Sequence, residues 1–175
     1  MLQLFCSALA LVAWGAGTTP APTGQIDFDK LRLHQLAFIS SRSQVQQRLG
    51  KPQAVTEPNY ECGAYSSQEQ GQKFYELRYP QVRFIGNSKE GYAIDFVYFS
   101  AKSPALTYGG QPLTNRTTVA DLQRLFGPGT HAEKIKTAEM PQGQEAVSVS
   151  SNHDDGAIFW FSRGRLVKFE YWTPC

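Results

Sequence analysis

A short stretch that occurs twice decides the fold: SSRSQVQQRLGKP at residues 40–52 and TTVADLQRLFGPG at residues 117–129. The two copies align with Gly50 over Gly127, which gives a repeat period of 77 residues (127 − 50). In each copy a hydroxyl residue can cap the first helical turn, and apolar residues recur four positions apart on one face. A glycine with a proline close behind it then ends the helix. The stretch therefore predicts two short, capped helices.

Three strand-length segments follow each predicted helix. They are rich in β-branched and aromatic residues and are separated by turn sequences, so each set predicts an antiparallel meander. The segments are 73–79, 81–86 and 92–99 after the first helix, and 146–151, 156–161 and 165–172 after the second. A fourth strand is predicted between each helix and its meander, at 53–57 and at 131–136.

The residues ahead of the two helices differ. Phe28, Leu31 and Leu36 suggest a preceding helix in the first unit, whereas residues 106–110 resemble a strand and a turn in the second. The fold class that follows is α+β. It consists of one helix-plus-antiparallel-meander unit at residues 25–101 and a second unit at residues 102–175.

Residues 1–24 have the composition of a signal peptide and a polar linker. Residues 2–16 carry no charge, and a Gly-, Thr- and Pro-rich stretch follows them. This apolar run is too short to span a bilayer, so no membrane span is expected. Phe5 precedes Cys6 at the start of the run, which argues against a lipoprotein signal at that cysteine. We expect a periplasmic or secreted protein, and a buried N-terminal helix is the alternative.

Removal of the leader leaves two cysteines, Cys62 and Cys175. In an oxidising compartment an even pair favours a disulfide. The closed loop would span 113 residues (175 − 62), for which chain entropy gives an upper figure of about 4–5 kcal/mol. The alternative is that both cysteines remain free thiols in a cytosolic protein.

Composition and motifs indicate neither nucleic-acid binding nor catalysis. The net charge is +2, which does not indicate a basic surface for binding nucleic acid or anionic lipid. No phosphate-binding glycine loop, metalloprotease motif or nucleophile motif is present. The three histidines, His34, His131 and His153, are far apart in the sequence, so no metal site is predicted. We expect no cofactor and no enzymatic activity.

The repeated helix closed by Leu49-Gly50-Lys51-Pro52, followed by antiparallel strands and duplicated at 77 residues, resembles the β-lactamase inhibitor protein superfamily. A single unit is also similar to the small lipoproteins of the outer-membrane β-barrel assembly machine. This resemblance implies one continuous sheet across both units, with helices on one face and an open face that grips a protein. The inhibitors carry more disulfides and an acidic hairpin loop that has no counterpart here, so the resemblance does not extend to β-lactamase as the target.

Strict alternation along the strands assigns side chains to two faces. The more uniformly apolar set is assigned to the helix-covered core: Tyr75, Leu77, Tyr79, Val82, Phe84, Ile94, Phe96, Tyr98, Phe159, Phe161, Val167, Phe169 and Tyr171. The alternate set mixes aromatic residues with charges and is assigned to the open face: Phe74, Glu76, Arg78, Arg83, Ile85, Asp95, Val97, Phe99, Ile158, Trp160, Lys168, Glu170 and Trp172.

Seven residues of the alternate set are the predicted partner-binding site: Phe74, Arg78, Phe99, Trp160, Lys168, Glu170 and Trp172. Aromatic and arginine anchors beside charges are typical of protein-binding surfaces. The alternative is an ordinary half-solvated sheet with cross-strand charge pairs. Two functions therefore remain open: a binder of a protein partner, of inhibitor, immunity or envelope-accessory type, and a module that binds a small ligand or a cell-wall glycan through its aromatic side chains.

Overall fold

The computed structural model describes residues 24–103, 105–128, 130 and 144–175. Residues 1–23 of the predicted signal segment and the second predicted fourth strand, 131–136, lie outside these residues. The elements are η1 (Phe28–Lys30), β1 (Leu31–Leu33), β2 (Leu36–Ala37), β3 (Ile39–Ser40), α1 (Arg42–Leu49), β4 (Ala54–Thr56), α2 (Ser67–Gln70), β5 (Tyr75–Arg78), β6 (Val82–Asn87), β7 (Gly91–Tyr98), β8 (Leu106–Tyr108), β9 (Gln111–Leu113), α3 (Val119–Phe126), β10 (Gln144–Ser150), β11 (Gly156–Ser162) and β12 (Arg165–Trp172).

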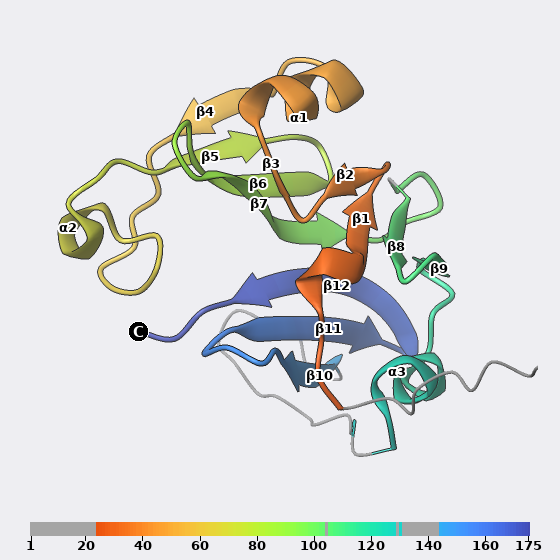
Figure 1. The fold of residues 1–175 in the computed structure, drawn as a ribbon. Helices are drawn as coiled ribbons and strands as arrows, with labels where there is room; N and C mark the ends of the chain where they lie inside the picture. Colours follow the sequence, from red (N-terminus) through yellow and green to blue (C-terminus); the bar gives the residue numbers. More distant parts are fainter. Residues whose placement is uncertain (1–23, 104, 129, 131–143) are drawn as a thin grey trace, which may run out of the picture.

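A large antiparallel sheet dominates the structure (Figure 1). Its strand order is β10-β11-β12-β7-β6-β5-β4, so the two predicted meanders meet where β12 pairs with β7. One edge of β7 is shared: β3 pairs with its first half, at Ala93 and Tyr92, and β12 with its second half. The described part of the chain is thus mostly antiparallel sheet with a few short helices, in agreement with the predicted α+β class.

Both predicted helices are present, and local side-chain chemistry explains their ends. Ser41 and Gln44 form a capping box at the start of α1, and Thr118 and Asp121 form one at the start of α3. Each box satisfies backbone N–H groups that a first turn leaves without partners. Gly50 and Gly127 follow the last residues of the helices, both at positive φ.

Of the helix predicted around Phe28, Leu31 and Leu36, only the short 3-10 turn η1 at Phe28 is present, and a second, four-stranded sheet with the order β2-β1-β8-β9 contains Leu31 and Leu36. That prediction was wrong because β1 pairs with β8, about 75 residues away in the sequence, through Leu31↔Tyr108 and Leu33↔Leu106. The strand and turn predicted at 106–110 correspond to β8 and its glycine turn.

The main core lies between the large sheet and a layer formed by α1, α3 and the small sheet. Val45 of α1, Leu122 and Phe126 of α3, and Leu33 of β1 are all buried in one cluster with Phe169 of β12. Both α1 and α3 therefore cover the same face of the large sheet. We call the opposite side the open face.

Two β-bulges change which residues reach the open face. In β7 the pairing with β6 shifts between Phe84↔Ile94 and Arg83↔Phe96, which inserts Asp95 as an extra residue. In β12 the pairing with β11 shifts in the same way around Val167. A bulge reverses the alternation beyond it, because two residues on one strand oppose a single residue on the other.

The face assignment is accordingly wrong at five positions. Val97 and Phe99 were assigned to the open face but are buried in the main core. Phe96 and Tyr98 were assigned to the core, yet they contact Arg83 and Lys168 on the open face. Val167, also assigned to the core, is the half-buried bulge residue of β12.

Cys62 and Cys175 lie at disulfide distance, with their Cα atoms 5.1 Å apart, as the sequence predicts. The pair joins the loop before α2 to the segment after β12. Within the described residues, no helix is long and apolar enough to cross a membrane.

Candidate functional site

The open face carries charged and aromatic side chains from five neighbouring strands. Two of its aromatic side chains are largely exposed, Tyr98 at 47% and Trp172 at 46%. The members that the argument uses are Glu76, Arg78, Arg83, Asp95, Phe96, Tyr98, Trp160, Lys168, Glu170 and Trp172.

Arg83 on β6 is the centre of one charge cluster. Its guanidinium Nη1 lies 3.0 Å from Oε1 of Glu76 on β5, and its Nε pairs with Oδ2 of Asp95. The guanidinium also lies 4.4 Å from the ring centre of Phe96, in cation–π geometry. Arg78 completes the cluster by donating from Nε to Oε2 of Glu76 at 2.8 Å.

Glu170 on β12 is the centre of a second cluster. Its Oε2 accepts from the indole Nε1–H of Trp160 at 2.8 Å and from Nζ of Lys168 at 2.9 Å. The same Nζ lies 5.2 Å from the ring centre of Phe96 and 5.7 Å from that of Tyr98. Phe96 therefore separates the two clusters and contacts the cation of each.

A cleft of about 420 Å³ lies at one end of the open face, between the loop around Tyr60 and the end of β12. We call it the Trp172 cleft. Both cysteines of the disulfide line it, so the covalent link fixes one wall. Its other lining residues include Tyr60, Glu61, Tyr65, Asp95, Glu170 and Trp172.

Burial changes the acidity of groups around the cleft. Asp95 is only 6% exposed, and this desolvation raises the pKa of its carboxyl above the ordinary value of 3.8, against the opposing effect of Arg83. Desolvation, aided by the charge of Asp95, raises the pKa of Tyr60 to about 12. Burial also raises the pKa of Tyr65 and of Tyr171. All three phenols are therefore neutral hydrogen-bonding groups at physiological pH.

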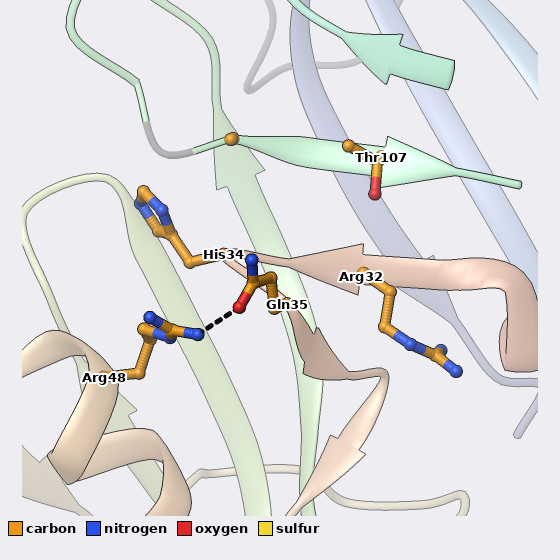
Figure 2. A pocket seen from close by; sticks show the side chains of 6 residues that line it. Arg32, His34, Gln35, Arg48 and Thr107 are labelled. Carbon is orange, nitrogen blue, oxygen red and sulfur yellow. Dashed lines mark hydrogen bonds between the residues drawn. The ribbon is translucent and has the colours of Figure 1, made fainter. Parts of the chain in front are cut away.

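A second concave region, of about 390 Å³, lies between the β1–β2 turn and α1. Figure 2 shows Arg48 of α1 donating to Gln35 in that turn, with Arg32 and His34 nearby. His34 and Gln35 have positive φ angles of 47° and 71°. A two-residue hairpin turn requires this backbone geometry, so the turn itself accounts for it.

The structure brings five of the seven predicted site residues to the open face: Arg78, Trp160, Lys168, Glu170 and Trp172. Trp160 is only 7% exposed, because Glu170 and its neighbours cover it. Phe74 is 1% exposed, with its ring against Tyr65 of the loop. Phe99 is 7% exposed and belongs to the main core, since the bulge at Asp95 reverses its direction. Neither phenylalanine is available to a partner.

Five residues of the open face were not among the seven predicted: Glu76, Arg83, Asp95, Phe96 and Tyr98. Tyr60, which lines the cleft, was not among them either. Alternation did assign Glu76, Arg83 and Asp95 to the open face, and the single carboxylate on each strand that flanks Arg83 was the available signal. Phe96 and Tyr98 could not be found in this way, because the bulge at Asp95 determines their direction.

The described residues contain no group of three or more His, Cys, Asp or Glu side chains that could hold a metal ion. Comparisons of the chain with family models, with curated proteins and with solved structures find no match. The function is therefore argued from the geometry of the open face and its cleft.

Proposed function

We propose that this chain is an exported, non-catalytic binding protein that holds a protein partner against the open face of its large sheet. One observation carries the proposal: the exposed rings of Trp172 and Tyr98 border half-buried ion pairs centred on Arg83 and Glu170. Exposed tryptophan and tyrosine rings close to an arginine are typical of the residues that carry most of the binding energy at protein interfaces.

The internal duplication and the superfamily resemblance belong to the same proposal. The helices α1 and α3 start 77 residues apart, at Arg42 and Val119, and each precedes three antiparallel strands. The strands β10-β11-β12 and β7-β6-β5 stand in mirrored order about the β12–β7 pair, as expected of two tandem units, and β4 extends the first unit by one strand. In the β-lactamase inhibitor protein superfamily, the open face of such a sheet is the surface that grips a protein.

Export is supported by the disulfide between Cys62 and Cys175. Such bonds persist in the periplasm and outside the cell and are rare in the cytosol. Together with the apolar leader, the bond favours a periplasmic or secreted protein. The mass of the protein recovered from the periplasm or the medium tests this, because a cleaved leader removes roughly the first two dozen residues.

A small-ligand or cell-wall-glycan function is the alternative, and the Trp172 cleft is the observation that favours it. An exposed indole beside a cleft of about 420 Å³ can stack on a sugar ring. The two functions differ in what contacts Trp172: a protein chain or a glycan.

Photo-cross-linking from opposite faces tests the proposal. Trp172 is replaced in one variant, and Val55 in another, by a photoreactive phenylalanine analogue. Val55 is 40% exposed and opposes Leu77, so it lies on the helix-covered side. We expect one protein to be cross-linked from position 172 and not from position 55. Cross-linking of that protein from position 55 alone, or of cell-wall glycan without protein from position 172, would overturn the proposal.

A further inference from the structure

We propose that the Trp172 cleft binds the cationic side chain of a lysine or arginine that the protein partner presents to the open face. This inference rests on the proposed function and names the chemistry by which the open face recognises its partner. In the part of the chain that the structure describes, the cleft combines two carboxylate oxygens that accept no hydrogen bond with aromatic walls, and no Arg, Lys or His lines it.

Two carboxylates that line the cleft each keep one oxygen available. Arg83 bonds to Oδ2 of Asp95, and both donors to Glu170 reach its Oε2. Among the hydrogen bonds of the described residues, none has Oδ1 of Asp95 or Oε1 of Glu170 as its acceptor. Asp95 is 6% exposed, and a buried acceptor without a donor is costly unless a ligand supplies one.

The walls favour an organic cation over a bare metal ion. Tyr60, Tyr65 and Trp172 line the cleft together with the two carboxylates. The faces of tyrosine and tryptophan rings attract ammonium and guanidinium groups within about 6 Å. Trp172 is 46% exposed and Tyr60 is 40% exposed, so both rings remain open to an entering side chain.

The charge around the cleft also favours a cation. Its lining includes Glu61, Asp95 and Glu170, and none of the described residues that line it is Arg, Lys or His. Arg83 and Lys168 pair with Asp95 and Glu170 and offset their charge, and Nη2 of Arg83 also donates to the Tyr60 hydroxyl at 3.4 Å. Glu61 remains as a further acidic group at the wall. The ammonium or guanidinium group of an entering side chain would donate to the two available oxygens.

Titrations followed by NMR test the cleft without knowledge of the partner. The probes are N-acetyl-arginine amide and N-acetyl-lysine amide, and the matched neutral control is N-acetyl-citrulline amide, which has nearly the shape of the arginine probe. The indole N–H signals of Trp172 and Trp160 report binding, the second because Trp160 donates to Glu170. A ligand the size of one side chain should saturate with a dissociation constant on the order of 1–10 mM.

We expect the cationic probes to shift the Trp172 signal saturably and the citrulline probe to bind at least about tenfold more weakly. Glu170→Gln should weaken the binding of the cationic probes by a similar factor. Glu145 lies on β10, outside the cleft lining, so Glu145→Gln is the matched control and should leave the binding of these probes unchanged. Equal binding of arginine and citrulline probes, or no saturable shift with any probe, would overturn the inference.

Cross-linking in the same variants separates this inference from the proposed function. A lower yield from position 172 in Glu170→Gln, with a normal yield in Glu145→Gln, supports a partner side chain in the cleft. An unchanged yield alongside cation binding would assign the cleft to a free organic amine and overturn the partner's role. If the probes fail while the protein is still cross-linked from position 172, the inference fails and the proposed function remains.

Discussion

Trp160 on β11 donates its indole Nε1–H to Oε2 of Glu170 on β12, at 2.8 Å. The same oxygen accepts from Lys168, so the indole is held beside an ion pair. Trp160 is consequently only 7% exposed, whereas Trp172 on the same face is 46% exposed. The two tryptophans, which the sequence presents as equivalent anchors, therefore differ in role: Trp160 stabilises the open face, and Trp172 is available to a ligand.

The first prediction concerns the two tryptophans. We expect Trp160→Ala to lower the free energy of unfolding by about 3–5 kcal/mol, because it removes a buried ring. Trp172→Ala should change it by no more than about 0.5 kcal/mol, as exposed positions do. Urea denaturation of both variants measures the difference. Equal losses in the two variants would show that the burial of Trp160 does not matter.

The second prediction separates two phenylalanines that strict alternation places in one core. Phe169 is fully buried, and Phe169→Ala should lower the free energy of unfolding by about 3–5 kcal/mol. Phe96 lies half-buried between Arg83 and Lys168 on the open face, so Phe96→Ala should cost about 1–2 kcal/mol, mainly in cation–π contacts. Denaturant midpoints of the two variants, measured under the same conditions, test which variant loses more stability. Phe96→Ala would lose more than Phe169→Ala if Phe96 faced the main core.

The helices could be predicted from the sequence because their signals are local. The Ser41 side chain caps α1 by accepting from the backbone N–H of Gln44, three positions along, and Thr118 caps α3 in the same way. The small sheet could not be predicted, because β1 is ordered by β8, about 75 residues later. A short apolar segment such as β1 has no periodicity of its own that distinguishes a strand from a helix.

Strict alternation assigned the side chains of β7 to the correct faces up to its bulge at Asp95 and to the wrong faces beyond it. Residues 94–99 read IDFVYF, and apart from Asp95 they are apolar or aromatic at every position, so no local pattern marks Asp95 as an extra residue. The pairing of Arg83 with Phe96, and of Val82 with Val97, determines the register instead. Arg78 and Glu170 were therefore placed correctly, whereas Phe99 was not.

The third prediction concerns the disulfide. In the purified mature protein, thiol titration after unfolding without reductant should find no free thiol. Cys62→Ser combined with Cys175→Ser should lower the free energy of unfolding by up to about 4–5 kcal/mol, the loop-entropy figure for 113 residues. Two titratable thiols in the untreated protein would contradict both the bond and the argument for export.

Gly63, the residue after the cleft-lining Cys62, gives a fourth prediction. Its φ is 87°, and a Cβ added there would lie 2.9 Å from the carbonyl oxygen of Pro174. Gly63→Ala should therefore push the loop away from the segment after β12 and weaken binding in the cleft. Gly71→Ala is the control, because its φ of 62° imposes a similar strain but nothing lies within 4 Å of the added carbon. Equal effects of the two variants on cation binding would contradict the packing argument.

The fifth prediction concerns pH. Asp95 has a raised pKa in the folded state, so its stabilising contribution is complete below pH 3.8 and is lost as the pH rises through the raised value. Asp121 has a lowered pKa because Thr118 donates to it, so its contribution is present above pH 3.8 and is lost as the pH falls through the lowered value. Asp95→Asn and Asp121→Asn should therefore change the pH dependence of the urea midpoint in opposite directions, and changes of the same sign would contradict the assignment.

The last prediction tests Arg83 as the centre of its charge cluster. Arg83→Met keeps the apolar stem but leaves Asp95 buried without its cation, whereas Glu76 retains Arg78. Removing one partner of a buried pair is more damaging than removing both. We expect Arg83→Met to lower the free energy of unfolding by about 2–4 kcal/mol. This is somewhat less than the ~3–5 kcal/mol for breaking a fully buried pair, because the Arg83 side chain is 23% exposed. Adding Asp95→Asn to Arg83→Met should recover part of this loss. Urea denaturation of both single variants and the double variant gives the coupling free energy, and strictly additive losses would show that Arg83 and Asp95 act independently.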